Sequence, residues 1–277
     1  MGNKSRNKQK PLIYLTNDDG VQSPGLHALV SEIARFADIK VIAPSHQMTA
    51  TGRGLFGGRD VQLESTELTV NGESITAYHA PCSPAQVVML GVKIFRQERE
   101  PDLLISGINY GENLGRDITM SGTIGAAIQG TCMGIPSLAV SMQTPIDGHY
   151  QYGDVNWQTA SYFAVKFAGI MLERAMPPDV DLLKVDVPDS ATKKTEWQVT
   201  RVARQSYFSA ELEAPTLESS LADSQIIKIK DPSHLEKDSD IYVFLKEGKV
   251  TVTPISLDFS SRTDLNKLQD YLNNSEK

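Results

Sequence analysis

Two adjacent carboxylates, Asp18 and Asp19, follow directly after the apolar run Leu12–Thr16 and are flanked by Asn17 and Gly20. The run predicts a buried strand, and in an open α/β sheet ligands bind at the carboxyl ends of the strands. Neighbouring carboxylates repel each other unless a positive charge lies between them, and a divalent cation bound by oxygen atoms supplies one. The same residue types are typical of a solvent-exposed turn. Taken alone, these four residues leave a cation site and a turn equally open.

A second segment is expected to meet this pair. The apolar run Asp102–Ser106 predicts another buried strand, and it is followed by a glycine-rich loop that contains Asn109 and Asn113. In a doubly wound sheet this loop emerges at the same edge as the two carboxylates, and an amide oxygen is a good ligand for a hard cation. Both asparagines could instead adopt left-handed turn conformations without any ligand.

Ser121, Gly122 and Thr123 begin a predicted helix that is rich in small residues and runs to about Met133. Free N–H groups and the helix dipole at such a start suit a phosphate group. Ser and Thr are also ordinary N-cap residues, and this simpler interpretation is preferred for the isolated signal. A cation site nearby would favour phosphate binding. Asp117, just before the helix, could bind substrate or complement the helix dipole.

Other site classes fit the sequence poorly. Gly52, Gly54 and Gly57 have dinucleotide-motif spacing, but they neither directly follow a strand nor open a helix. They indicate a flexible or ligand-covering loop. No G-x-x-x-x-G-K-[ST] motif opens a helix, and adjacent rather than spaced aspartates argue against a haloacid-dehalogenase-like phosphatase. The five histidines show no ligand spacing such as i, i+4.

The first part of the chain alternates strand and helix signals, which predicts a doubly wound, mainly parallel, Rossmann-like α/β sheet. The Asn71-Gly72 pair predicts a hairpin, and Ser83 to Gln86 form a capping-box sequence. The expected elements are strands at 12–16, 39–43, 67–70, 74–78, 102–106 and 137–141, and helices at 24–36, 84–95, 121–133 and 157–174.

The C-terminal third carries mainly strand signals, with a tight hairpin predicted at Glu247-Gly248 and a closing helix at Asp264–Leu272. Residues 206–240 are polar and acidic, which indicates a surface loop or an arm that packs on another subunit. The expected strands are Leu183–Val187, Trp197–Arg204, Ile226–Lys230, Ile241–Leu245 and Lys249–Thr253.

The composition of the chain excludes several classes of binding partner and site. The 277 residues carry a net charge of -7, from 34 acidic and 27 basic side chains, which disfavours binding to a nucleic-acid polymer. Cys82 and Cys132 are too few for a disulfide scaffold or a thiolate zinc site. No apolar run is long enough to span a membrane, and no apolar segment follows the basic residues 1–10. We expect a soluble cytoplasmic protein with a disordered basic tail at residues 1–10.

In combination, these motifs resemble the SurE survival-protein family. The resemblance extends from about Pro11 to Pro254. It rests on Thr16-Asn-Asp-Asp-Gly20, Ala43-Pro44 with Thr49-Ala-Thr-Gly52, Ser106-Gly-Ile-Asn109 through Asn113-Leu-Gly115, Ser121-Gly-Thr-x-Gly-Ala-Ala127, Val185-Asp-Val-Pro188, Val199-Thr-Arg201 and Val250-Thr-Val-Thr-Pro254.

The resemblance implies a metal-dependent 5'-nucleotidase that hydrolyses nucleoside 5'-monophosphates, and also 3'-nucleotides and short polyphosphate. It implies one Mg²⁺ or Mn²⁺ per subunit, held by Asp18, Asp19, Thr49 and Asn109, with Thr49 standing where the family has Ser. Gln129 and Met120 are further departures from common family residues. The resemblance also implies one α/β domain over 11–277 that forms homodimers or homotetramers, with 206–255 as an exchanged arm.

The mechanism expected from this resemblance is phosphomonoester hydrolysis by in-line attack of water. The metal neutralises charge on the phosphate, while Asn113, Ser121, Gly122 and Thr123 hold the remaining oxygens. Asp18 or Asp19 orients or deprotonates the water. Two alternatives are a non-catalytic nucleotide or phosphate sensor and a different metal-dependent transferase on the same sheet.

Overall fold

The structure is a computed structural model that describes residues 9–145 and 152–274. Of the predicted basic tail at residues 1–10, only Gln9 and Lys10 fall within the described residues, and both are exposed. None of the helices in these two ranges has the length and apolar content needed to cross a bilayer.

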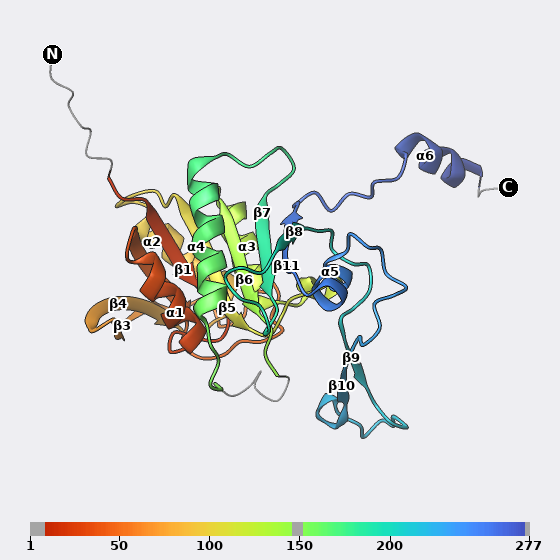
Figure 1. Ribbon diagram of the computed structural model, residues 1–277, viewed down its shortest axis with the longest axis horizontal. Helices are drawn as coiled ribbons and strands as arrows, with labels where there is room; N and C mark the ends of the chain where they lie inside the picture. The colour runs from red at the N-terminus through yellow and green to blue at the C-terminus, as the bar shows by residue number, and fades with distance from the viewer. Residues whose placement is uncertain (1–8, 146–151, 275–277) are drawn as a thin grey trace, which may run out of the picture.

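A nine-stranded sheet forms the centre of the molecule, in the order β3-β4-β2-β1-β5-β6-β7-β11-β8 (Figure 1). Neighbouring strands are parallel except for β3 with β4 and β7 with β11. The doubly wound, mainly parallel sheet is therefore confirmed. Its strands are β1 (Leu12–Thr16), β2 (Asp38–Pro44), β3 (Glu64–Val70), β4 (Glu73–Ala80), β5 (Leu103–Tyr110), β6 (Ser137–Met142), β7 (Leu182–Val187), β8 (Trp197–Val199) and β11 (Val250–Ile255).

Helices cover both faces of this sheet. Ile13 and Leu15 of β1 pack in one core with residues of α1 (Pro24–Ile33) and α4 (Gln158–Glu173). Leu12 and Tyr14 pack in the opposite core with residues of α2 (Pro84–Phe95) and α3 (Gly122–Cys132). Because both faces of β1 are buried, its sequence is a continuous apolar run rather than an alternating one.

The predicted starts of α2 and α3 are confirmed. Ser83 Oγ accepts a hydrogen bond from the Gln86 N–H at 3.3 Å, but the Gln86 side chain donates to the Gly58 carbonyl at 2.6 Å. Only half of the capping box therefore forms. Ser121 Oγ accepts from the Ile124 N–H at 3.2 Å and so caps α3.

The strand predicted at Ile241–Leu245 is wrong. These residues lie in α5 (Asp240–Glu247), whose first turn is capped by Ser239. A short apolar run fits a helix or a strand equally well by periodicity, and here Ile241 and Phe244 are buried at helical spacing. The hairpin predicted at Glu247-Gly248 is wrong for the same reason, since Gly248 ends the helix in a left-handed conformation with φ of 63°.

The segment between β8 and α5 projects from the main body as a small two-stranded antiparallel sheet (Figure 1). Its strands are β9 (Phe208–Glu211) and β10 (Gln225–Lys228), and a short 3-10 helix, η3 (Leu221–Asp223), precedes β10. The predicted strand Trp197–Arg204 is shorter than expected, because only β8 is a strand. The range 206–255, predicted as an exchanged arm, thus contains this projecting hairpin, α5 and the main-sheet strand β11.

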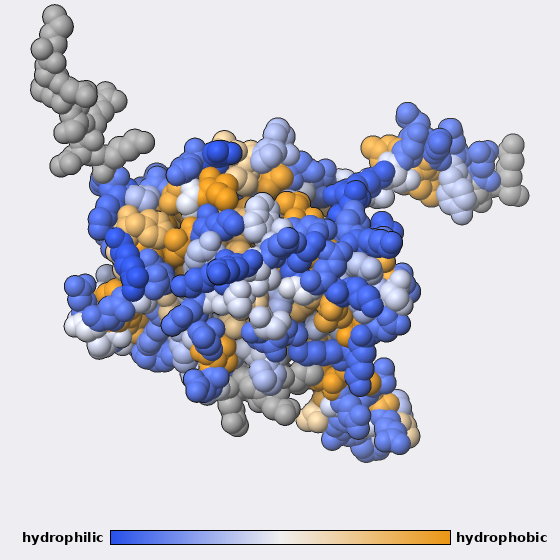
Figure 2. All heavy atoms as spheres, viewed as in Figure 1, coloured by the Kyte–Doolittle hydropathy of each residue, from blue (hydrophilic) through white to orange (hydrophobic). Residues whose placement is uncertain are grey.

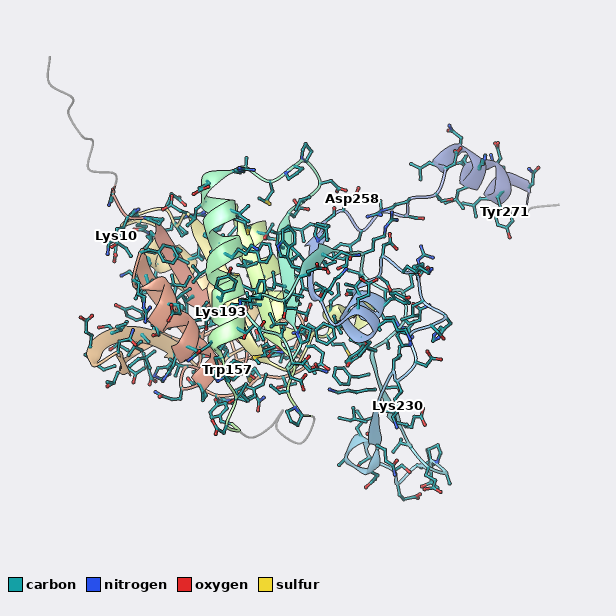
Figure 3. The ribbon with its side chains drawn as sticks, viewed as in Figure 1. Lys10, Trp157, Lys193, Lys230, Asp258 and Tyr271 are labelled. Atoms are coloured by element: carbon teal, nitrogen blue, oxygen red, sulfur yellow. The ribbon has the colours of Figure 1, made fainter. Side chains whose placement is uncertain are left out.

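The chain leaves the sheet after β11 and ends in α6 (Leu265–Asn273), which confirms the closing helix. Asp264 caps it through the N–H groups of Asn266 and Lys267. Figure 3 shows Asp258 and Tyr271 on this C-terminal extension, away from the main sheet. None of the α6 residues is buried, and apolar side chains of the helix lie at the surface in Figure 2. A second short helix, η1 (Arg116–Thr119), precedes α3.

Candidate metal and phosphate site

The predicted site residues converge at the carboxyl ends of β1 and β5 and at the start of α3. Five of them line one cavity of about 210 Å³: Asp18, Thr49, Asn109, Asn113 and Ser121. Asp19, Gly122 and Thr123 are buried behind that wall. The strand β5 is longer than predicted, so Asn109 lies within it rather than in the following loop.

Asp18 packs against the start of α3. The Thr123 hydroxyl donates a hydrogen bond to Asp18 Oδ1, and a Cβ on Gly122 would lie only 2.7 Å from Asp18 Oδ2. Glycine at position 122 therefore permits the close approach of the carboxylate to the helix. In this arrangement the Thr123 side chain holds Asp18, which leaves Ser121 as the side chain of this segment that faces the cavity.

Asp19 is oriented by groups from three other segments. Its Oδ1 accepts from Gln47 Nε2 at 3.3 Å, and its Oδ2 accepts from the Tyr110 N–H at 3.2 Å. The Tyr152 hydroxyl donates to the Asp19 carbonyl at 2.6 Å. Both carboxylates are thus held in place by neutral donors.

The hydrogen bonds from these donors do not offset the effect of burial on the pKa values of the two carboxyl groups. Burial raises the pKa of Asp18 to about 6, against the lowering effect of Thr123 and of the backbone N–H groups of α3. Burial, together with the negative charge of Asp18, raises the pKa of Asp19 well above its usual value. Within the described ranges no lysine, arginine or histidine forms an ion pair with either residue.

The donor set fits a hard divalent cation. Two buried carboxylates share the site with the amide of Asn109, whose Nδ2 donates to the Gly111 carbonyl at 2.7 Å and so turns its oxygen away from that carbonyl. Over the residues that the structure describes, no three His, Cys, Asp or Glu side chains cluster as a metal site. Carboxylate and neutral oxygens without nitrogen or sulfur suit Mg²⁺ or Mn²⁺ better than Zn²⁺.

The glycine-rich loop carries Thr49 to the cavity because it is fixed at both ends. The Met48 N–H donates to the Asp18 carbonyl at 2.7 Å, and the Gly52 N–H donates to the Met120 carbonyl at 2.8 Å. A Cβ on Gly125 of α3 would lie 2.0 Å from the Gly52 carbonyl oxygen, so glycine is required at this crossing. The glycine motif itself begins at Gly52, well after β2 ends at Pro44, and it does not open a helix, consistent with rejecting a dinucleotide motif.

Comparisons with known proteins agree with this geometry. Residues 13–209 match the family described as "Survival protein SurE". The chain belongs to the SurE family. It is 36% identical to the 5'-nucleotidase SurE of Thermococcus gammatolerans over 94% of this chain and 95% of the relative. It is 35% identical to the 5'-nucleotidase SurE 1 of Thermus thermophilus over 94% of this chain and 97% of that relative.

Structural similarity extends over the same length. The crystal structure of the SurE protein from Aquifex aeolicus superimposes with a TM-score of 0.73 and 27% sequence identity. That alignment covers 96% of this chain and 100% of the Aquifex chain. The family and the α/β fold expected from the sequence are confirmed.

Gln129 and Met120, which the resemblance marks as departures from common family residues, both lie close to the site. Gln129 of α3 accepts a hydrogen bond from Arg53 Nε at 3.0 Å, which ties the glycine-rich loop to the helix. Met120 is 57% exposed and lines the cavity next to Ser121.

Sequence analysis missed the part of the SurE cavity wall that comes from the projecting hairpin. Phe208 of β9 and Ile226 of β10 line the cavity together with the predicted ligands. Asp117 fixes the base of this hairpin, since its Oδ2 accepts from the N–H groups of Tyr207 and Phe208, both at 2.8 Å. The sequence indicated substrate binding or complementation of the helix dipole for Asp117, and neither includes this contact with the hairpin. No signal in the sequence pairs Asp117 with Tyr207, which lies 90 positions later.

Proposed function

We propose that this chain is a metal-dependent 5'-nucleotidase that hydrolyses nucleoside 5'-monophosphates to nucleoside and phosphate. The observation that carries the proposal is the buried Asp18–Asp19 pair, which has no cationic partner among the described residues and whose Asp18 lines a cavity beside a helix start. Its SurE relatives bear the name 5'-nucleotidase, which supports the same reaction here.

We propose that Asp18, Asp19, Thr49 and Asn109 hold one Mg²⁺ or Mn²⁺. When bound, such an ion neutralises negative charge on the phosphate and lowers the pKa of water. Thr123 keeps Asp18 against α3, while Gln47 and the Tyr110 N–H keep Asp19 in place. The chain thereby presents two fixed carboxylates, which limits reorganisation during the reaction.

The phosphate oxygens face polar groups from two segments. Ser121 at the start of α3 and Asn113 after β5 both line the cavity, and the helix dipole of α3 favours an anion there. Gly122 and Thr123, the other two predicted phosphate ligands, direct their backbone N–H groups at Asp18 and so act on this end of the site by holding that carboxylate. The proton of the attacking water passes to the Asp18–Asp19 pair, which we treat as one titrating unit because the two groups are close and buried.

The nucleoside is expected to lie against the apolar part of the cavity. Met120, Phe208 and Ile226 line this part, and Phe208 offers a ring on which a base can stack. The last two come from the projecting hairpin. Its position next to the cavity is consistent with substrate binding at an arm that also mediates self-association.

We further propose that the protein forms a homodimer or homotetramer through residues 206–255. The hairpin projects from the body and exposes Leu217, Leu221 and Ile226. Light scattering coupled to size exclusion should give a mass of two or four chains. A monomer at all concentrations would contradict the assembly but not the reaction.

The reaction is tested on protein stripped with a chelator. Phosphate release is measured for a panel of nucleoside 5'- and 3'-monophosphates and short polyphosphate, with Mg²⁺ and Mn²⁺ restored separately. The proposal expects no release from the stripped protein and release from 5'-monophosphates once metal is returned. Binding of nucleotides without release under every condition would overturn it and identify a sensor instead.

A further inference from the structure

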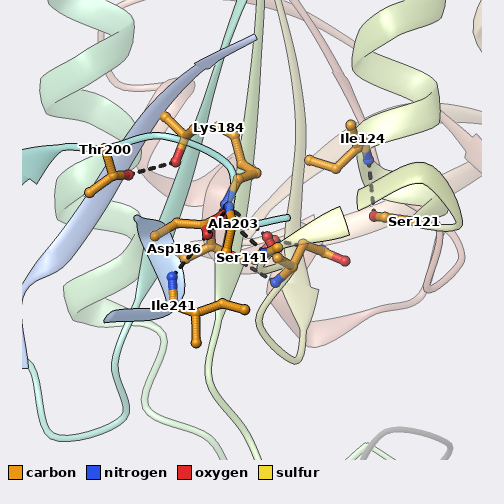
Figure 4. A network of polar contacts seen from close by, with 12 residues as sticks. Ser121, Ile124, Ser141, Lys184, Asp186, Thr200, Ala203 and Ile241 are labelled. Carbon is orange, nitrogen blue, oxygen red and sulfur yellow. Dashed lines mark hydrogen bonds and ion pairs between the residues drawn. The ribbon is translucent and has the colours of Figure 1, made fainter. Parts of the chain in front are cut away.

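A lysine lies fully buried within the main sheet, between two equally buried aspartates. Lys184 and Asp186 are on β7, and Asp240 begins α5; the three side chains have 0% exposure. Lys184 Nζ forms ion pairs with Asp186 and, at 3.2 Å, with Asp240 (Figure 4). Fully buried charged residues are rare, and an apolar cluster of the same volume is often as stable as a buried ion network. Packing alone therefore does not explain why these three charged residues are buried here.

The contacts that leave this cluster converge on the segment that carries Asn113. Lys184 Nζ donates to the Asn113 carbonyl at 2.8 Å, and the Asn113 N–H donates to Asp186 Oδ1 at 2.7 Å. Two residues later, the Gly115 N–H donates to Asp240 Oδ2 at 3.1 Å. Both backbone polar groups of Asn113 are thus held by charged side chains, and hydrogen bonds to ionised groups are stronger than neutral ones.

The side chain of Asn113 is fixed from another direction. Its Nδ2 donates to Ser141 Oγ on β6 at 2.8 Å, and the residue lines the cavity next to Asn109. An amide has two N–H bonds, so one remains for a ligand in the cavity. The backbone held by the charged cluster and the side chain held by Ser141 together set the direction of that remaining donor.

We propose that Lys184, Asp186 and Asp240 are positioning residues that orient Asn113 toward a phosphate group in the cavity. The inference rests on the proposed function in one respect, the assignment of Asn113 as a phosphate ligand. None of the three side chains lines the cavity, so their effect on a bound phosphate passes through Asn113. Asp240 also accepts from the Ala203 N–H at 2.9 Å, which connects the same cluster to the chain leading into the hairpin.

The test compares Asp186→Ala with Asp186→Asn. Binding of inorganic phosphate to the Mn²⁺-loaded protein is measured by calorimetry, alongside Mn²⁺ affinity, KM and kcat for a nucleoside 5'-monophosphate. Loss of a charge-assisted hydrogen bond to Asn113 is expected to weaken phosphate binding and raise KM about tenfold in Asp186→Ala. Asn keeps an acceptor at this position, so Asp186→Asn should stay within about threefold of the wild type on both measures. Mn²⁺ affinity should be unchanged in both variants.

A control separates positioning from general stability. Ser137→Ala removes the hydrogen bond that the buried Ser137 hydroxyl donates to the Ile135 carbonyl at 2.9 Å, at the start of β6, and this bond involves neither Asn113 nor the Lys184 cluster. It should lower Tm without changing phosphate affinity. The proposal is overturned if Asp186→Ala lowers Tm but keeps wild-type phosphate affinity and KM. It is also overturned if Asp186→Asn loses as much phosphate affinity as Asp186→Ala.

If Asp186→Ala does not fold, the variant Lys184→Met/Asp186→Leu/Asp240→Asn replaces the cluster without leaving an uncompensated charge. The same selective loss of phosphate binding is expected, and wild-type affinity would overturn the proposal. Failure of the proposed function gives a different result. A wild-type protein that binds phosphate but hydrolyses no nucleotide refutes the reaction, while the affinity ratio still decides the role of the cluster. A wild type that binds no phosphate overturns both.

Discussion

Among the residues that the structure describes, Asp186 with Asp240 and Asp18 with Asp19 are two pairs of buried carboxylates, and they differ in how their charge is balanced. Asp186 and Asp240 share the ammonium group of Lys184, which reaches both from β7. Asp18 and Asp19 at the end of β1 receive hydrogen bonds from neutral donors, and no described residue offers them an ion pair. The negative charge of Asp186 and Asp240, the closed pair, is balanced by a cation within the chain. The charge of Asp18 and Asp19, the open pair, requires a positive charge from outside.

This difference separates a positioning element from a reactive one. The Lys184 cluster is sealed and its polar groups are directed at backbone atoms, which makes it rigid. Asp18 borders a cavity with Asp19 beside it, and a buried group with a shifted pKa at a cavity is typical of a functional site. Substitutions that alter one pair at a time test whether the other pair responds.

The largest effect is expected from Asp19→Asn. An amide is a weaker cation ligand than a carboxylate, so phosphate release should fall about 1000-fold, equivalent to about 4 kcal/mol of activation free energy. The measurement is turnover with saturating Mn²⁺, on protein shown to be folded by circular dichroism. A folded variant with wild-type turnover would refute the metal site at this pair.

Removing the internal cation should also lower stability. Lys184→Met leaves Asp186 and Asp240 buried without a counter-charge, and breaking such a network costs about 3–5 kcal/mol of unfolding free energy. Denaturant unfolding measures the loss, and added Mg²⁺ should not restore it. Lys194→Met, at an exposed lysine, serves as the control and should unfold like the wild type. Equal stability of the two variants would show that the cluster is not a balanced ion network.

The metal-free protein should lose stability as pH rises. Carboxyls whose folded pKa exceeds the unfolded value bind more protons in the folded state, so their penalty appears as pH rises from the unfolded value toward and beyond about 6 for Asp18. Between weakly acidic and neutral pH, Tm should fall by roughly 5 °C in the presence of chelator. Asp186, whose pKa burial also raises to about 6, contributes in the same direction.

The double variant Asp18→Asn/Asp19→Asn isolates the contribution of the open pair to this pH dependence. Its Tm should vary less with pH than that of the chelated wild type, and added Mn²⁺ should flatten the wild-type curve in the same way. Identical curves for the wild type and the double variant would assign the pH dependence to other groups.

The smallest effect is expected at Thr49. Thr49→Ser keeps the hydroxyl and should stay within about threefold of wild-type kcat/KM, whereas Thr49→Val should lose about tenfold. Steady-state kinetics with a nucleoside 5'-monophosphate measure both. Equal activity of the Ser and Val variants would remove Thr49 from the ligand set.

The contrast between the two pairs also shows what the sequence can predict. Asp18 and Asp19 are neighbours that directly follow an apolar run, so local pattern and strand order were sufficient to place them at the carboxyl edge. The start of α3 at Ser121 was predictable because a cap and a run of small residues are both local signals. Family resemblance supplied Thr49, which no spacing rule connects to the pair.

The closed pair was not predictable, because its members are distant in sequence. Lys184 and Asp186 stand two residues apart and so share one face of β7, but Asp240 comes more than 50 residues later. It also lies at the start of α5, a helix whose apolar residues were assigned to a strand. The hairpin residues Phe208 and Ile226 were missed for the same reason, since only the folded arrangement brings them to the cavity.

The central claim is that the open pair requires a cation from outside, and calorimetric titration of chelator-treated protein with Mn²⁺ at neutral pH tests it most directly. We predict one ion per chain, with binding lost in Asp19→Asn and retained in Lys194→Met. Absence of binding to the wild type, or undiminished binding to a folded Asp19→Asn protein, would contradict the account.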